Sequence, residues 1–89
     1  AEWIIKERGE LFRALAALPG VHPRPTAANF IFFHCDFETD RVYEELLRRG
    51  VLIKNFNAPG GMKNCMRVTV GTREENAEFL ATLKDILSK

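Results

Sequence analysis

The sequence has few cysteines and no long apolar run. Its 89 residues include only Cys35 and Cys65, which lie far apart. This spacing disfavours a zinc knuckle, a redox pair or a disulfide scaffold, so we expect reduced thiols. Together with His22 and His34 they show no metal-binding spacing, and we expect no metal site. No apolar run approaches the roughly 20 residues that a membrane span requires.

The sequence also lacks an excess of either charge. Thirteen Lys and Arg against twelve Asp and Glu leave a net charge of +1. Such a balance disfavours nucleic acid and anionic membranes as partners, so any anion site must be local. The start, Ala1-Glu2-Trp3, lacks the basic and apolar regions of a signal peptide. We therefore expect a cytoplasmic protein of one domain, with a thin stability margin at this length.

Residues for autonomous catalysis are scarce as well. Ser88 is the single serine and stands next to the last residue. The acidic pairs Glu44-Glu45 and Glu74-Glu75 fall on expected helix faces, and Gly60-Gly61 lacks the spacing of a nucleotide-binding loop. We therefore expect no catalytic residue and no cofactor-binding residue in this chain.

Apolar residues recur at helical spacing in three segments. The first helix is expected over residues 3–18, because Pro19-Gly20 would stop it. The second is expected from Thr39, as its N-cap, to Gly50. Its expected buried stripe is Val42, Tyr43, Leu46 and Leu47. The third follows Thr72, which with Glu75 has the pattern of a capping box.

Three further segments favour strands. Residues 29–34 are apolar and aromatic, which favours a strand with both faces covered. Residues 51–54 and 66–70 are rich in β-branched side chains. Two prolines in residues 21–26 predict a connector.

The order α-β-α-β-β-α predicts an α+β fold, a two-layer sandwich with a three-stranded sheet and helices on one face. We expect a leading helix in residues 1–20 and an α/β core in residues 27–89.

Three polar residues near the predicted strands are candidates for binding. Arg67 alternates with Met66, Val68 and Val70, so its guanidinium should lie on the polar face, where it suits a carboxylate or phosphate. Lys54 could add a second positive charge for a dianion, or be an edge-strand lysine that discourages aggregation. Asn29 could line a site or satisfy a chain bend. A solvated strand arginine is the commoner explanation for Arg67 alone.

The sequence is rich in phenylalanine. Stacking of bases on a sheet, as in RNA-binding domains, is one explanation, but basic residues do not interleave with the rings along the sequence. We therefore expect the rings to pack in the core. The residues concerned are Phe30, Phe32, Phe33, Phe37 and Phe56.

Three blocks of the sequence together resemble the C-terminal end of histidinol-phosphate aminotransferases. These are Ala28-Asn-Phe-Ile31, Gly50-Val-Leu-Ile-Lys-Asn-Phe56 and Asn64-Cys-Met-Arg-Val-Thr-Val-Gly-Thr-Arg-Glu-Glu-Asn76. The stretch from Arg67 to Asn76 is the most specific part. The resemblance covers essentially the whole chain.

This resemblance implies the small domain of an enzyme that uses pyridoxal 5'-phosphate in histidine biosynthesis. The complete enzyme transfers an amino group between glutamate or 2-oxoglutarate and a phosphorylated amino alcohol or ketone. Arg67 matches the family's residue for the substrate anion, Lys54 stands where the family commonly has arginine, and Asn29 matches an asparagine that lines the active site. The family binds its cofactor through a lysine of a large domain that this chain lacks, and its members are usually homodimers.

Two alternatives remain at this point. Lysine at position 54 keeps the charge but loses the bidentate fork, which leaves other substrates open. A related pyridoxal-phosphate enzyme, such as another amino-acid aminotransferase or a threonine-phosphate decarboxylase, would share the architecture. A free-standing α/β binding module without enzymatic activity is the second alternative.

Overall fold

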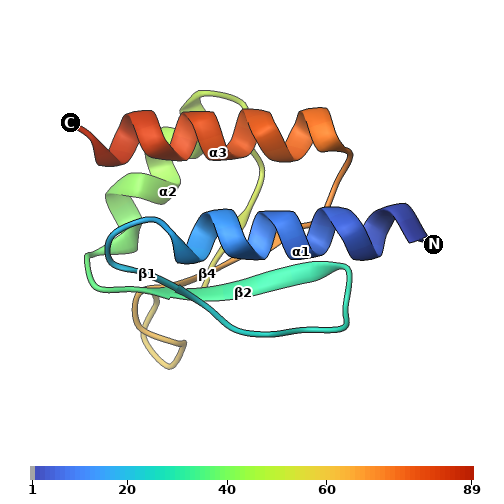
Figure 1. The fold of residues 1–89 in the computed structure, drawn as a ribbon. Coiled ribbons are helices and arrows are strands. Elements are labelled where there is room, and N and C mark those ends of the chain that lie inside the picture. Colours follow the sequence, from blue (N-terminus) through green and yellow to red (C-terminus); the bar gives the residue numbers. More distant parts are fainter. Residues whose placement is uncertain (1) are drawn as a thin grey trace.

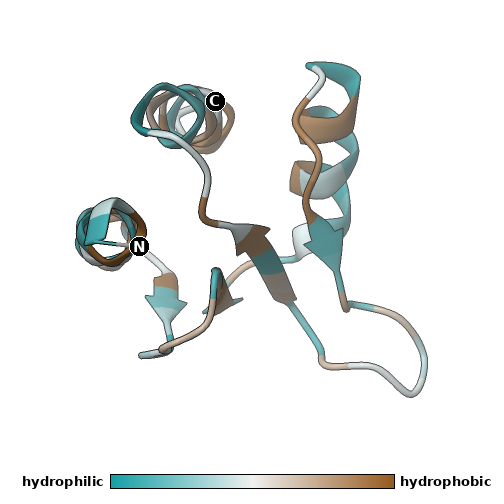
Figure 2. Cartoon of the chain, turned by 90° about the vertical axis from the view of Figure 1, so that its right-hand side faces the viewer, coloured by the Kyte–Doolittle hydropathy of each residue, from teal (hydrophilic) through white to brown (hydrophobic). Residues whose placement is uncertain are grey.

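The computed structural model describes residues 2–89, which form three helices on one face of a four-stranded antiparallel sheet (Figure 1). The strands lie in the order β1-β2-β4-β3. Figure 2 shows α1 and α3 nearly end-on and on the same side of the sheet as α2. No helix in this range is both long and apolar enough to cross a membrane. The elements are α1 (Glu2–Ala16), β1 (Val21–Pro23), β2 (Phe30–Cys35), α2 (Thr39–Arg48), β3 (Lys54–Asn55), β4 (Cys65–Thr69) and α3 (Arg73–Leu87).

The α+β architecture and the placement of the helices on one face are as predicted, but the sheet has one more strand than expected. The predicted connector at residues 21–26 contains β1, so the order is α-β-β-α-β-β-α. Val21 pairs with Cys35 and Pro23 with Phe33. Proline is tolerated here because β1 is an edge strand and Pro23 is its last residue, where a missing N–H breaks no ladder.

Alternate residues of β2 and β4 make the centre of the core. Ile31 pairs with Val68 and Phe33 with Met66, and all four side chains are buried under the helices. The predicted inward face of β4 is confirmed, since Val70 is buried too. From the helices, the buried apolar side chains are Leu11, Leu15, Val42, Leu46, Phe79 and Leu83.

Two predicted patterns of burial are wrong. The expectation that both faces of β2 are covered fails, because Phe30, Phe32 and His34 are only half-buried on the face that carries no helix. In the predicted stripe of α2, Leu47 is 40% exposed. It points away from the core that Val42 and Leu46 enter.

The predicted strand over residues 51–54 shrinks to Lys54 and Asn55. The backbone N–H of Val51 donates to the carbonyl of Leu46 at 2.9 Å, which closes α2 around Gly50. Gly50 has φ +83°, the left-handed conformation predicted for it. Val51 and Ile53 then pack against the core as a link rather than as a strand.

The N-termini of α2 and α3 are capped in different ways. At α3 the predicted capping box is present: Glu75 N–H donates to Thr72 Oγ1 at 3.2 Å and Thr72 N–H donates to Glu75 Oε1 at 2.8 Å. At α2 the prediction of Thr39 as N-cap is wrong. Glu38 occupies that position without a capping side chain, and Thr39 N–H donates instead to Asn64 Oδ1 at 3.3 Å. A residue distant in sequence therefore replaces the local cap.

Candidate functional site

The sheet face without helices carries the predicted site residues Arg67 and Lys54. Arg67 is the register partner of Phe32 on β2 and of Lys54 on β3. Directly paired residues point to the same face of a sheet, so the three side chains project together. Phe30 stands two residues from Phe32 and shares this face.

Arg67 is held by aromatic rings rather than by an acid. Its guanidinium carbon lies 4.8 Å from the ring centre of Phe30 and 6.0 Å from that of Phe56. The side chain is half-buried, and Arg67 forms no salt bridge within residues 2–89. The planar donors therefore remain available for an anion.

Lys54 brings a second positive charge to the same place. It is exposed, and its Nζ lies 5.5 Å from the ring centre of Phe56. Like charges directly opposite each other on a sheet repel. No carboxylate among the described residues forms a salt bridge with either one. An anion between Lys54 and Arg67 would relieve the repulsion.

Asn29 forms no hydrogen bond with Arg67 or Lys54. It is exposed just before β2, where its carbonyl accepts from Val70 N–H at 2.8 Å. Its side chain makes no hydrogen bond to another residue in the range 2–89. This contact involves the backbone, so both interpretations of the Asn29 side chain remain predictions.

The expectation that all five phenylalanines pack in the core is wrong for three of them. Phe33 is buried and Phe37 packs against the core. Phe30, Phe32 and Phe56 lie on the open face, where they interleave with Arg67 and Lys54 in space although not in sequence. Residues 30–35 are apolar at nearly every position, so the alternation of buried and half-buried side chains appears only in the structure.

Sequence reasoning also missed a network of polar side chains that fixes β3 and the loop after it. Asp40 Oδ1 accepts from Asn55 Nδ2 at 2.9 Å and from Asn57 Nδ2 at 3.1 Å. The buried Thr39 hydroxyl donates to Asn55 Oδ1 at 2.9 Å, and Asn64 N–H donates to Asn57 Oδ1 at 3.0 Å. Together these bonds tie the segment that carries Lys54 to the start of α2.

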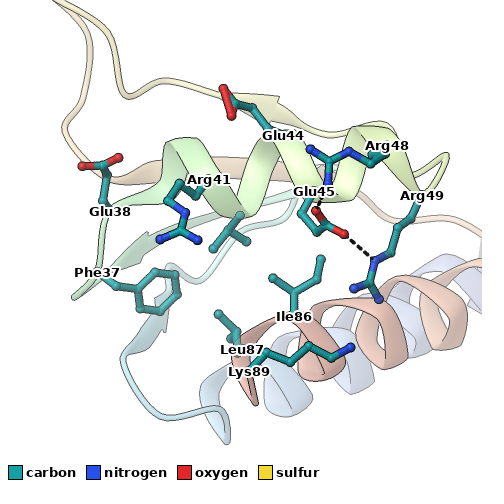
Figure 3. Close-up of a pocket in the computed structure, with 11 residues that line it drawn as sticks. Phe37, Glu38, Arg41, Glu44, Glu45, Arg48, Arg49, Ile86, Leu87 and Lys89 are labelled. Atoms are coloured by element: carbon teal, nitrogen blue, oxygen red, sulfur yellow. Dashed lines mark hydrogen bonds and ion pairs between the residues drawn. The ribbon is translucent and has the colours of Figure 1, made fainter.

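A shallow groove between α2 and the end of α3 is a weaker candidate (Figure 3). Its Arg49 is paired with Glu45 at 3.1 Å and with Asp85 at 2.7 Å. The hydrogen bond from Arg49, followed by the charge of Lys89, lowers the pKa of Asp85. Since these charges already neutralise one another, we interpret the groove as a contact between two helices rather than as a ligand site.

The cysteines and histidines form no reactive centre. Both thiols are free and buried, and burial, more than the nearby Cys65 or Asp36, raises the pKa of Cys35 to about 12. The thiol of Cys35 is therefore protonated and unreactive. His22 Nε2 lies 2.9 Å from Asp36 Oδ2. In the described part of the chain, no three His, Cys, Asp or Glu side chains converge as metal ligands would.

The sequence of the chain is similar to those of histidinol-phosphate aminotransferases. It is 45% identical over 86 residues to histidinol-phosphate aminotransferase 2 of Nitrosococcus oceani, a match that covers 94% of this chain and 24% of that enzyme. The chain thus spans about a quarter of the length of the curated relatives it matches. No protein-family model matches it. The resemblance predicted from the three sequence blocks is confirmed.

Solved structures show the same fold. A decarboxylase from Sulfurospirillum multivorans matches with a TM-score of 0.84 and 28% identity, covering 97% of this chain and 25% of that one. The histidinol-phosphate aminotransferase of Clostridium acetobutylicum matches with a TM-score of 0.88 and 22% identity, covering 98% of this chain and 27% of that one. In both cases the matched part is one segment of a much longer chain.

Proposed function

We propose that this chain is the C-terminal substrate-binding domain of a pyridoxal-phosphate-dependent aminotransferase. It is similar to about a quarter of the length of each histidinol-phosphate aminotransferase that it matches. The complete enzyme would transfer an amino group between glutamate or 2-oxoglutarate and a phosphorylated amino alcohol or ketone. A large domain outside this chain would hold the cofactor, and the complete enzyme would be a cytoplasmic homodimer.

The observation that carries the proposal is the pair of unneutralised cations on the open sheet face. Arg67 and Lys54 are direct partners across β4 and β3, and neither forms a salt bridge within residues 2–89. Arginine offers a planar fork that fits a carboxylate or phosphate, while lysine offers a point charge. The two together suit the anionic groups of the proposed substrates.

We further propose that pyridoxal phosphate is held outside this chain. The cofactor forms a Schiff base with a lysine of its binding site. The exposure of all five lysines of this chain supports the proposal; they are Lys6, Lys54, Lys63, Lys84 and Lys89. In this proposal, the domain binds and orients the substrate, and the chemistry of the cofactor belongs to the large domain. Asn29, just before β2, would line the substrate site.

The experiment that tests the proposal is Arg67→Lys in the full gene product that carries this sequence. We expect a loss of about 1.5–3 kcal/mol in kcat/KM for the amino donor, because the charge survives but the bidentate geometry does not. Arg73→Lys, an exposed residue of α3, is the matched control and should have no effect. If Arg67→Lys left kcat/KM unchanged for every donor, Arg67 would be an ordinary surface arginine.

Lys54→Arg should weaken catalysis less than Arg67→Lys, or favour phosphorylated substrates, because it adds a second fork. The isolated 89-residue chain should neither transaminate nor bind pyridoxal phosphate covalently. Borohydride reduction followed by mass spectrometry measures this directly. Stoichiometric labelling of one lysine would contradict the assignment of the cofactor to another domain.

Two other functions have an observation in their favour. The solved decarboxylase at 28% identity favours a related decarboxylase as the complete enzyme. Release of carbon dioxide from a phosphorylated amino acid by the full gene product, without amino transfer, would identify it. Aromatic rings beside cations on an open sheet also suit a free-standing binding module. A gene that encoded little beyond these residues would favour that alternative.

A further inference from the structure

The ring of Phe56 lies near both cations of the proposed anion site. Its ring centre is 5.5 Å from Lys54 Nζ and 6.0 Å from the guanidinium carbon of Arg67. The ring also contacts Phe32, with 5.2 Å between centres and 47° between planes. One side chain thus touches both positively charged groups and the aromatic surface beneath them.

An aromatic ring orients a cation without cancelling its charge. The face of the ring attracts a nearby ammonium or guanidinium through its quadrupole, whereas a carboxylate would neutralise the group. Phe30 contributes a second ring to Arg67 alone, at 4.8 Å. Phe56 is the ring that Lys54 and Arg67 share, so it sets the position of one relative to the other.

The backbone around Phe56 is fixed from several directions. Its N–H donates to the Cys65 carbonyl at 2.9 Å, and its own carbonyl accepts from Ala58 N–H and Met62 N–H, each at 2.9 Å. A Cβ on Gly61 would lie 2.3 Å from the Phe56 carbonyl oxygen, so the loop can fold this closely only with glycine there.

The residues on either side of Phe56 are anchored as well. Asn55 and Asn57 both donate to Asp40 on α2. Alternation along an extended segment sends these two side chains toward the helix, while Lys54 and Phe56 project on the other side. These hydrogen bonds fix the backbone that carries the Phe56 ring.

We propose that Phe56 is a positioning residue of the anion site, whose ring orients Lys54 and Arg67 so that both can bind the same phosphate or carboxylate group. The proposal rests on the proposed function, because it assumes that these two cations bind an anion. Phe56 acts through the cations and does not contact the reacting atoms.

The test measures binding of inorganic phosphate to the full gene product by calorimetry, together with KM and kcat. Phe56→Leu keeps an apolar side chain but removes the ring. We expect phosphate affinity to fall about fivefold, from a loss of roughly twofold or more at each cation, with KM raised and kcat little changed. Phe56→Trp should restore the affinity, because indole attracts cations at least as strongly as phenyl.

Phe37→Leu is the matched control, since Phe37 is also half-buried but packs against the core away from the cations. It should leave phosphate affinity unchanged. Unchanged affinity in Phe56→Leu, or an equal loss in Phe56→Leu and Phe56→Trp, would overturn the proposal. If Phe56→Leu did not fold, weaker phosphate binding by Phe56→Trp than by the original protein would overturn it as well.

Arg67→Lys separates this proposal from the function on which it rests. If Arg67→Lys left phosphate affinity unchanged, the anion site itself would be wrong. If Arg67→Lys weakened phosphate binding while Phe56→Leu did not, the site would stand and only the role of Phe56 would fail. In the double variant the Phe56→Leu effect should shrink, because residues that act through each other are not additive.

Discussion

The two faces of the sheet are made by the same strands but do different things. On β2, Ile31 and Phe33 are buried under the helices, while Phe30 and Phe32 are half-exposed on the opposite face. On β4, Met66 and Val68 are buried, while Arg67 lies on the open face. Since successive side chains alternate, one short strand supplies both the core and the open face that carries the proposed anion site. The covered face should therefore control folding, and the open face should control binding.

The largest expected difference between the faces is between two neighbouring phenylalanines. Phe33→Ala should cost about 3–5 kcal/mol, because the ring is fully buried and its removal leaves a cavity. That loss is comparable with the whole stability of a small domain. Phe32→Ala, the matched change on the open face, should cost roughly 1.5 kcal/mol or less. Urea unfolding of the two variants measures both values, and equal midpoints would remove the distinction between the faces.

A smaller effect is expected from a polar residue on the covered side. Asn76 is 6% exposed, and its side chain bonds both backbone groups of Gly71: it accepts from the N–H at 2.9 Å and donates to the carbonyl at 3.1 Å. Asn76→Ala would leave these groups unpaired and should cost about 1–3 kcal/mol. Asn29→Ala, at an exposed asparagine, should stay within about 0.5 kcal/mol. Thermal unfolding compares the two, and an equal loss in both would contradict the assignment.

The features that the sequence predicted correctly depend on residues close together in the sequence. Those that it missed depend on residues far apart in the sequence. The capping box of Thr72 and Glu75 spans four residues, so a local pattern was enough to identify it. The replacement of Thr39 as a cap by Asn64 could not be foreseen, because it depends on how the loop before β4 folds back to α2. The prolines near Val21 likewise concealed β1, since only the sheet order shows that it is an edge.

In the candidate site too, the local feature was predictable and the long-range contacts were not. Arg67 could be placed on the polar side of β4 from alternation alone, and the structure has it there. Its neighbours could not be predicted, because Phe30, Lys54 and Phe56 reach it only through the pairing of β4 with both β2 and β3. Pairing of strands from distant segments is invisible to local periodicity.

The capping box provides a third, smaller test. Thr72→Ala removes the side-chain acceptor for Glu75 N–H and should cost about 1 kcal/mol, the usual value for an N-cap threonine. Thr69→Ala makes the same change at an exposed position at the end of β4 and should be nearly neutral. Chemical unfolding monitored by circular dichroism would measure both. A neutral Thr72→Ala would mean that α3 is held by packing alone.

The smallest expected effect lies at the surface where α2 meets α3, and it depends on pH. The hydrogen bond from Arg49 lowers the pKa of Asp85 below its ordinary value of 3.8. A carboxyl group whose pKa is lower in the folded state stabilises the fold above its unfolded pKa, and this contribution disappears as pH falls through the folded pKa. Asp85→Asn should therefore be slightly less stable than the original protein at pH 7, and the difference should vanish in acid. Both ends of the pair are solvent-exposed, so the effect should be smaller than that of Thr72→Ala.

Glu44→Gln, at an exposed residue of α2 without a salt bridge in the described range, is the control. A difference between Asp85→Asn and the original protein that persisted at low pH would show that the Arg49 ion pair is not its cause.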